Sequence, residues 1–239
     1  MRIALVGYGK MGKAIEALAI DAGHQVSKII DADNASEIGK ISPDNTDVAI
    51  EFSQPSTAYD NIKTLVGNGV TTMVGTTGWL DHYDEIAKLC KKNKGTFLYA
   101  SNYSIGVNLF FELNKWLAER MASLGGFGVE MEEIHHTEKK DSPSGTAITL
   151  AEGILANNAR KKGWVNEKTD DKESIGIVSL REPAVPGTHT VNYHSPLESI
   201  EIKHTAHDRK VFAAGVIKVA EWITNQSGVL TMEDFIKQS

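Results

Sequence analysis

The pattern of apolar residues at the start of the chain predicts three successive elements. Residues 3 to 6 form a short apolar run that is typical of a buried strand. Apolar side chains recur at helical spacing over residues 10 to 22, and residues 25 to 30 are again rich in strand-forming residues. This order of strand, helix and strand predicts the βαβ unit of a parallel sheet.

Three further β-rich runs follow in the first hundred residues. They cover residues 47 to 53, 71 to 78 and 96 to 102, and each ends in small polar side chains. The segments between them, 56 to 69 and 79 to 94, have helical spacing, and Gly67 or Gly69 is expected to end the first. Strands that alternate with helices favour a doubly wound α/β domain of the Rossmann type.

The pattern changes after residue 102, which indicates a second domain. Residues 104 to 124 have the spacing of one long amphipathic helix, and residues 127 to 136 form a strand with alternating apolar side chains. A second helical run covers residues 147 to 162, and Ser144 just before it is a typical helix-start residue. A helix is therefore expected to begin near Ser144.

A glycine motif lies at the first junction between strand and helix. Gly7, Gly9 and Gly12 have the spacing G-x-G-x-x-G, which combines a tight turn, close backbone approach to a pyrophosphate and tight helix packing. The backbone of Lys10 and Met11, at the helix start, is expected to face the phosphates.

An acidic residue ends the second strand of the predicted βαβ unit. Asp31 lies 19 residues beyond Gly12, where a carboxylate can accept hydrogen bonds from a ribose 2′-hydroxyl. The alternatives are an ordinary glycine turn and a solvated carboxylate at Asp31, since Asp33 lies two residues further on.

Ligands of doubly wound sheets bind at the carboxyl ends of the strands. The residues that end the later predicted strands are therefore candidates to contact a dinucleotide, although each could equally be an ordinary loop residue. They are Phe52, Ser53, Gly75, Thr76, Thr77, Ala100, Ser101 and Asn102.

The stretch "EIHHTEKKDSPSGTA", residues 133 to 147, is rich in donors. It places His135, His136, Lys139 and Lys140 before a helix start at Ser144, Gly145 and Thr146, whose N–H groups form an anion site. This pairing predicts a substrate with more than one carboxylate. The alternatives are a core or surface role for one histidine and a solvated turn for one lysine.

A metal site is not expected at the adjacent histidines. The chain has no H-E-x-x-H motif and no cysteine pair, and adjacent side chains on a strand point to opposite faces.

Composition narrows the class of protein further. The 239 residues suffice for two domains, and 41% hydrophobic with 23% charged residues is ordinary for a globular protein. A formal charge of −6 argues against a nucleic-acid partner. The single cysteine, Cys90, and the lack of a signal peptide or of a membrane-spanning apolar run favour a cytoplasmic protein without a membrane partner.

Seven motifs, in order, resemble the 4-hydroxy-tetrahydrodipicolinate reductase (dihydrodipicolinate reductase) family. They are "GYGKMG", "EFSQPST", "VGTTGW", "ASNYSIGVN", "EIHHTEKKDSPSGTA", "REPAVPGTHTV" and "FAAGVIKVAEWI". The resemblance implies an oxidoreductase of the diaminopimelate route of lysine biosynthesis that reduces a cyclic imine dicarboxylate to tetrahydrodipicolinate with NADH or NADPH. It also implies a homotetramer in which residues 1–104 and 210–239 bind the dinucleotide, while residues 105–209 bind substrate and form the tetramer.

The same resemblance implies roles for individual residues. His135 and Lys139 match the catalytic pair, and Lys139 is the first choice of acid because a protonated lysine is a donor at neutral pH. Contacts to the substrate carboxylates are implied for His136, Ser144, Gly145 and Thr146, and contacts to the cofactor for Gly75, Thr77 and Asn102.

The chain departs from the family pattern at four places, and the first is a glycine loop one residue shorter than in many members. Asp31 is followed by Ala32 rather than by an arginine, which predicts a bias toward NADH. "REPAVPG" replaces a more usual glycine-aspartate turn, and Arg209 in "HTAHDR" is a candidate hinge or carboxylate contact. The alternatives are another amino-acid-linked dehydrogenase, such as an aspartate dehydrogenase, and a module that senses NADH without catalysis.

Overall fold

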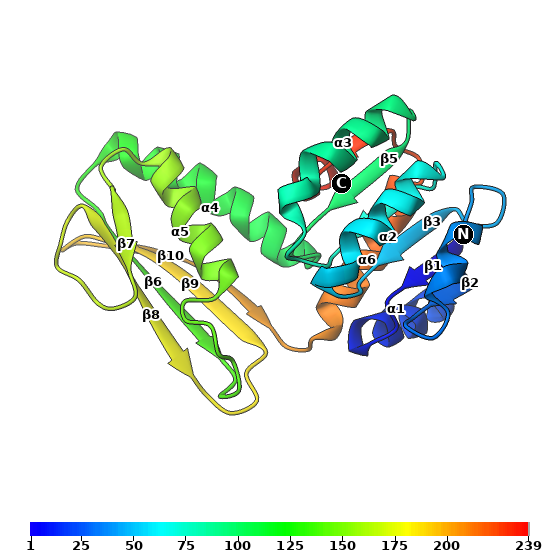
Figure 1. The fold of residues 1–239 in the computed structure, drawn as a ribbon. Coiled ribbons are helices and arrows are strands. Elements are labelled where there is room, and N and C mark those ends of the chain that lie inside the picture. The colour runs from blue at the N-terminus through cyan, green and yellow to red at the C-terminus, as the bar shows by residue number, and fades with distance from the viewer. Residues whose placement is uncertain (239) are drawn as a thin grey trace. The chain divides into compact units, whose positions relative to one another are not determined.

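A computed structural model describes residues 1 to 238 (Figure 1). The chain divides into two compact units, of which the first combines Met1–Ile105 with the C-terminal segment that begins at Lys210. The second unit is Gly106–Arg209. The sequence-based boundary between residues 104 and 105 lies one residue before the division in the structure, and both place the return to the first unit at Lys210.

The first unit contains a parallel sheet of six strands in the order β11-β5-β4-β3-β1-β2. Its chain order reverses direction between β1 and β3, as in doubly wound dinucleotide-binding folds. The strands are β1 (Arg2–Val6), β2 (Gln25–Ile30), β3 (Val48–Glu51), β4 (Thr72–Val74), β5 (Thr96–Tyr99) and β11 (Gly228–Leu230).

Helices cover both faces of this sheet. Side chains of α1 (Lys10–Asp21), α6 (Lys210–Ile223) and α7 (Met232–Gln238) share one buried cluster with the strands. A second cluster joins α2 (Pro55–Gly67) and α3 (Tyr83–Lys92) to β4 and β5. Two short 3-10 helices, Ala35–Lys40 and Leu80–His82, complete the connections.

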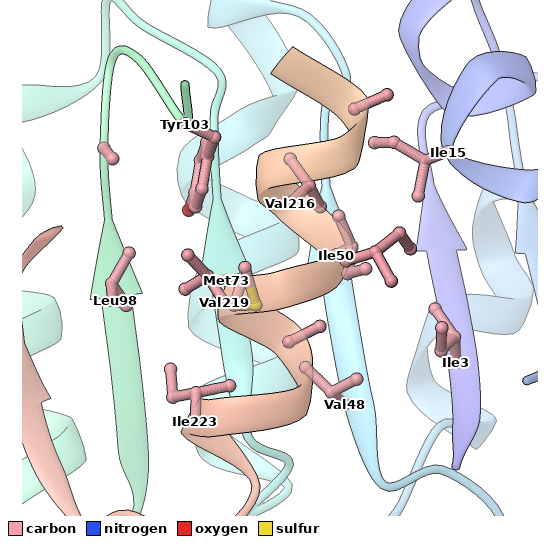
Figure 2. Close-up of a cluster of buried hydrophobic side chains, with 14 of the residues drawn as sticks. Ile3, Ile15, Val48, Ile50, Met73, Leu98, Tyr103, Val216, Val219 and Ile223 are labelled. Carbon is pink, nitrogen blue, oxygen red and sulfur yellow. The ribbon is translucent and has the colours of Figure 1, made fainter. Parts of the chain in front are cut away.

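The core of the first unit joins both ends of the chain. Figure 2 shows Val216, Val219 and Ile223 of α6 packed over the side chains of Ile50 and Met73, which lie on neighbouring strands. All five are at most 1% exposed, and burying one such side chain contributes about 1.5 to 3 kcal/mol. The C-terminal helix is therefore part of this core.

The second unit is a mixed sheet of five strands in the order β10-β9-β6-β8-β7. Helices α4 (Ile105–Leu124) and α5 (Gly145–Asn157) lie against the sheet and share its buried cluster (Figure 1). The strands are β6 (Gly128–His135), β7 (Gly163–Val165), β8 (Ser174–Arg181), β9 (Gly187–His194) and β10 (Ser199–Ala206). The β6 strand is central, pairing antiparallel with β9 and parallel with β8.

One predicted helix is too long. The helical pattern was expected to run to residue 162, but α5 ends at Asn157 because Asn158 has an extended backbone with φ of −139°. The Asn158 side chain accepts the N–H of Arg160 at 3.1 Å, a local bond that competes with helix continuation. No helix within residues 1 to 238 is long and apolar enough to cross a bilayer.

Candidate active site

The predicted dinucleotide contacts all follow strands of the parallel sheet at its carboxyl edge. The glycine loop follows β1, and Asp31 follows β2. The remaining candidates follow the next three strands: Phe52 and Ser53 follow β3, Gly75, Thr76 and Thr77 follow β4, and Ala100, Ser101 and Asn102 follow β5. The fold thus places them at the edge where ligands of doubly wound sheets bind.

The glycine loop has the geometry that its spacing predicts. Gly7 has φ of +95°, and a Cβ atom there would lie 2.1 Å from the carbonyl oxygen of Phe52. A Cβ atom at Gly12 would lie 2.3 Å from the carbonyl oxygen of Gly7. At Gly9, by contrast, no atom lies within 4 Å of a Cβ position. The two outer glycines are therefore required for packing, whereas the middle one borders space that can admit a pyrophosphate.

Asp31 is exposed at the end of β2. One of its carboxylate oxygens accepts the backbone N–H of Asp33 at 3.0 Å, and its own N–H donates to the Asn34 side chain at 2.7 Å. A carboxylate in this turn retains acceptor capacity for a ribose hydroxyl. The structure therefore offers the group that the sequence predicts.

Glu51, which the sequence analysis did not identify, ends β3 beside these residues. Its side chain is fully buried, and burial raises the pKa of its carboxyl group, although hydrogen bonds from Ser53 oppose the shift. The Ser53 backbone N–H donates to Glu51 Oε1 at 3.1 Å, and the Ser53 hydroxyl donates to the same oxygen. This carboxyl group fixes the turn that follows β3.

In the second unit, the start of α5 has the predicted cap. The Ser144 hydroxyl accepts the N–H of Ala147 at 3.2 Å. Since the first N–H groups of a helix have no partner within it, those of Gly145 and Thr146 are left for a ligand. A Cβ atom at Gly145 would meet no atom within 4 Å, so the space before this helix is open. This helix start can receive a carboxylate.

The two adjacent histidines contact different partners. His135 is 7% exposed, and its Nδ1 lies 3.4 Å from Glu133 Oε2. The Nε2 atom of His136 is 2.9 Å from an Arg209 guanidinium nitrogen. The structure thus separates the two imidazoles: His135 is the last residue of β6, and His136 follows the strand. His136 and Arg209 form a polar pair that can bind an anion when the guanidinium is free to donate.

His135 is held neutral at physiological pH. Its pKa is lowered to about 4, mainly by burial; His189, Lys139 and Arg181 also lower it, while the Glu133 carboxylate opposes the shift. At neutral pH a lysine ammonium group carries a proton that it can donate, whereas an imidazole with a lowered pKa has already lost its acidic proton. At neutral pH His135 is therefore uncharged and cannot act as an imidazolium acid.

Lys139 lies in the turn after β6. Its backbone N–H donates to the carbonyl of His136 at 3.1 Å, and its Nζ is 2.9 Å from the Asp141 carboxylate. The Lys139 side chain is 21% exposed, whereas that of Asp141 is 58% exposed. An ion pair at the surface contributes little to stability, so another anion can replace the Asp141 carboxylate. The structure describes no ion pair of this kind for Lys140.

A buried carboxylate connects these elements. Glu133 is fully buried, and its two oxygens accept the backbone N–H of Ser144 at 3.0 and 3.1 Å. Burial alone would raise the pKa of Glu133, but hydrogen bonds from His189, Ser144 and Ser179 hold it at about 2. Glu133 is therefore an anion at neutral pH.

Glu133, His189 and Arg181 were missed by sequence reasoning. A signal for Glu133 existed, because the buried side chains of β6 alternate from Val129 and Met131 to Glu133 and His135. No comparable pattern marks His189 on β9 or Arg181 at the end of β8, which reach the site through strand pairing.

Glu133, His135 and His189 could also hold a metal ion, because their ligand atoms lie within 4.8 Å of one another. The Glu133 oxygens, however, already accept two contacts from Ser144, and the Arg181 guanidinium lies 3.5 Å from Oε1. A cation at this position opposes metal binding. The expectation of no metal stays a prediction.

Family models match both parts of the chain. Residues 1–103 match "Dihydrodipicolinate reductase, N-terminus", and residues 106–236 match "Dihydrodipicolinate reductase, C-terminus". The chain belongs to the dihydrodipicolinate reductase family. This result confirms the resemblance that the motifs indicated.

Individual relatives agree with this family. A 4-hydroxy-tetrahydrodipicolinate reductase of Christiangramia forsetii is 46% identical over 236 residues, which cover 99% of this chain and 98% of the relative. One of Desulfovibrio desulfuricans is 36% identical and covers 91% of each chain. A dipicolinate-bound dihydrodipicolinate reductase from Paenisporosarcina sp. TG-14 has the same fold, with a TM-score of 0.79, 23% identity and 97% of each chain covered.

Proposed function

We propose that the chain is a 4-hydroxy-tetrahydrodipicolinate reductase, which reduces a cyclic imine dicarboxylate to tetrahydrodipicolinate with NADH or NADPH. The observation that carries the proposal is the grouping, within the second unit, of an open helix start and basic side chains. Ser144 at the helix start is bonded to Glu133, two residues before His135 on the same strand. Family membership supports this reading, and it counts against an aspartate dehydrogenase.

Two carboxylates need two sets of donors. We assign one to the N–H groups of Gly145 and Thr146 at the start of α5. The other is assigned to the polar pair of His136, which directly follows β6, and Arg209, which contacts it. Anchoring a planar ring at both ends restricts its orientation, which places the reacting carbon for transfer.

Reduction of the imine also requires a proton. We assign its donation to Lys139, because a lysine is protonated at neutral pH whereas His135 is held neutral by burial. The pairing of Lys139 with the exposed Asp141 must give way when a dianionic substrate enters. Lys139 then faces an anion with a stronger charge than one carboxylate.

The first unit fits a nicotinamide dinucleotide, which supplies the hydride when bound. Gly9 borders space for the pyrophosphate, Gly7 and Gly12 allow the tight turn and close packing beside it, and the backbone of Lys10 and Met11 lies at the helix start. We infer that the Asp31 carboxylate accepts the adenosine ribose hydroxyls and repels a 2′-phosphate, which favours NADH.

The assembly is inferred to be a homotetramer. The family resemblance implies this state, and α4 exposes a row of large apolar side chains at helical spacing, which supports association. They are Leu109, Leu113, Trp116 and Leu124, exposed by 42 to 74%. Light scattering should give a mass about four times 26.0 kDa, and a monomer would contradict the inference.

A coupled assay tests the reaction. The imine is generated from pyruvate and aspartate semialdehyde, and the absorbance of NADH is followed after the protein is added. We expect oxidation of NADH that depends on the imine. Turnover of oxaloacetate with ammonia instead would support an aspartate dehydrogenase, and NADH binding without turnover on either would support a sensing module.

A further inference from the structure

A single buried carboxylate lies at the centre of the polar groups around His135. Glu133 Oε2 lies 3.4 Å from His135 Nδ1 and 3.6 Å from His189 Nε2. Its other oxygen, Oε1, lies 3.5 Å from the Arg181 guanidinium. Both oxygens accept the Ser144 N–H. The Glu133 carboxylate, two residues before His135 in the sequence, therefore also binds the start of α5.

The carboxylate determines where the neutral imidazole of His135 carries its proton. A neutral imidazole has one N–H and one lone pair, and its neighbours decide which nitrogen has which. A lone pair on His135 Nδ1 would lie 3.4 Å from an anionic oxygen, although the two atoms form no aligned hydrogen bond, and electron density on both atoms would repel at that distance. The proton therefore belongs on Nδ1 of His135, which leaves Nε2 as an acceptor.

His189 has the complementary arrangement. Its Nε2 faces the Glu133 carboxylate at 3.6 Å and the Ser144 hydroxyl at 3.1 Å. The Ser144 hydroxyl already accepts the N–H of Ala147. With a proton on Nε2, His189 donates to the Ser144 hydroxyl and places a positive N–H dipole 3.6 Å from the Glu133 carboxylate, so this ring lies between the cap of α5 and the same carboxylate.

Arg181 extends the network to the turn that carries Lys139. Its Nε lies 3.4 Å from the carbonyl oxygen of Lys139, and an Nη2 donor lies 2.7 Å from that of Asp141. One guanidinium therefore contacts both the buried carboxylate and the turn. One charge therefore contacts His135 and the helix start directly, and it contacts the turn that carries Lys139 through Arg181.

We propose that Glu133 is a positioning residue whose carboxylate selects the Nδ1–H form of His135 and the Nε2–H form of His189, and thereby preforms the dicarboxylate site at the start of α5. The proposal rests on the proposed function for the identity of the ligand. In this form the Nε2 atom of His135 carries a lone pair and accepts hydrogen bonds. His135 therefore cannot donate a proton from that nitrogen, and Lys139 remains the donor.

The direct test is the tautomeric state of the wild-type protein. In protein labelled with [15N]histidine, imidazole nitrogen shifts at neutral pH distinguish Nδ1–H from Nε2–H rings. Signals are assigned by their loss in His135→Asn and His189→Asn. We expect Nδ1–H for His135 and Nε2–H for His189. The opposite form at His135 would overturn the proposal, and the outcome needs neither turnover nor a folded Glu133 variant.

The second arm measures the consequence for binding. Glu133→Gln keeps the shape but replaces one acceptor oxygen with a donor, and the exposed neighbour Glu132→Gln is the matched control. Calorimetry should show pyridine-2,6-dicarboxylate binding at least about tenfold weaker in Glu133→Gln, with NADH affinity unchanged, and no change in the control. Normal diacid binding with a wild-type tautomer pattern in Glu133→Gln would overturn the proposal.

These readouts separate the proposal from the proposed function. A wild-type protein that has the expected tautomers and binds the diacid, but does not oxidise NADH with the imine, would refute the reductase assignment alone. A protein that turns over the imine while His135 carries its proton on Nε2 would refute the role of Glu133 alone.

Discussion

Glu51 and Glu133 are both fully buried glutamates on strands, one in each unit, yet their surroundings drive their charge in opposite directions. Around Glu51 the partners are hydroxyl and amide groups, so burial dominates and raises the pKa of its carboxyl group. Around Glu133, donors from Ser144 and His189 outweigh burial and hold its pKa at about 2. The donors around a buried acid can therefore outweigh the effect of burial on its charge.

This difference matches the chemistry proposed for each unit. The first unit offers a carboxyl edge lined by small and polar residues around a glycine loop, which suits a large ligand held by backbone groups. The second unit concentrates fixed charges around a short helix start, which suits a small dianion.

The largest expected effect is on stability. Glu133→Gln removes a buried charge that faces cationic and N–H donors, so the free energy of unfolding should fall by about 3 to 5 kcal/mol. Glu51→Gln removes a carboxyl group that burial already disfavours as an anion, and it should change that free energy by less than about 1 kcal/mol. Denaturant titration of both variants measures the difference. Equal losses would mean that the charge of Glu133 is unimportant.

The dependence of stability on pH should show the buried histidine beside Glu133. Because the pKa of His135 is about 4 in the folded protein instead of 6.5, the unfolded chain binds its proton first as the pH falls. Stability should therefore fall from pH 6.5 to about 4, by roughly 3 kcal/mol from this group. The difference between wild type and His135→Asn over this range isolates the contribution. Parallel pH curves for the two proteins would argue against a neutral, buried His135.

Lys139 should separate catalysis from cofactor binding. Lys139→Ala should lower kcat by roughly 100-fold or more, the lower end of what one general acid contributes, while NADH affinity stays nearly unchanged. Lys140→Ala is the matched control, as its neighbour in the same turn. An equal loss in Lys140→Ala would contradict the choice of Lys139 as the acid. Normal turnover in both variants would mean that neither lysine donates the proton.

A change at Asp31 should, in contrast to one at Lys139, alter the choice of cofactor in the first unit. Because its carboxylate repels a 2′-phosphate, wild-type kcat/KM for NADH should be at least as high as for NADPH. Asp31→Ser should shift the ratio toward NADPH by roughly tenfold, the value of one charge-assisted contact, without weakening diacid binding. Steady-state kinetics with each cofactor measures the ratio. A wild type that clearly prefers NADPH would refute the role of Asp31.

Local patterns predicted much of the fold because they depend on neighbours in sequence. The glycine spacing, the strand at residues 25 to 30 and the cap at Ser144 are each determined within a few residues. Contacts made through the sheet were not predictable in this way. His189 and Arg181 approach Glu133 only because β6 pairs with β9 and β8, and a single sequence does not show strand order.

The candidate site shows the same limit at one residue. The identity of His135 and Lys139 followed from a motif, but the pKa of His135 depends on burial and on four neighbours, three of them more than two residues away in sequence. The end of α5 at Asn157 was also missed, because Asn158 leaves the helix through a side-chain bond that competes with an apolar pattern. The charge state of His135 and the end of α5 therefore depend on contacts that the apolar pattern of the sequence does not show.

The most direct test of the account is whether the start of α5 binds one of two carboxylates. Calorimetry should show pyridine-2,6-dicarboxylate binding about 10- to 150-fold more tightly than pyridine-2-carboxylate, since a charge-assisted contact is worth roughly 1.5 to 3 kcal/mol. Gly145→Val adds a side chain where no protein atom lies within 4 Å of the Cβ position, so it should crowd the ligand and weaken the diacid while NADH binds normally. Equal affinity for monoacid and diacid, or normal diacid binding in Gly145→Val, would contradict the account.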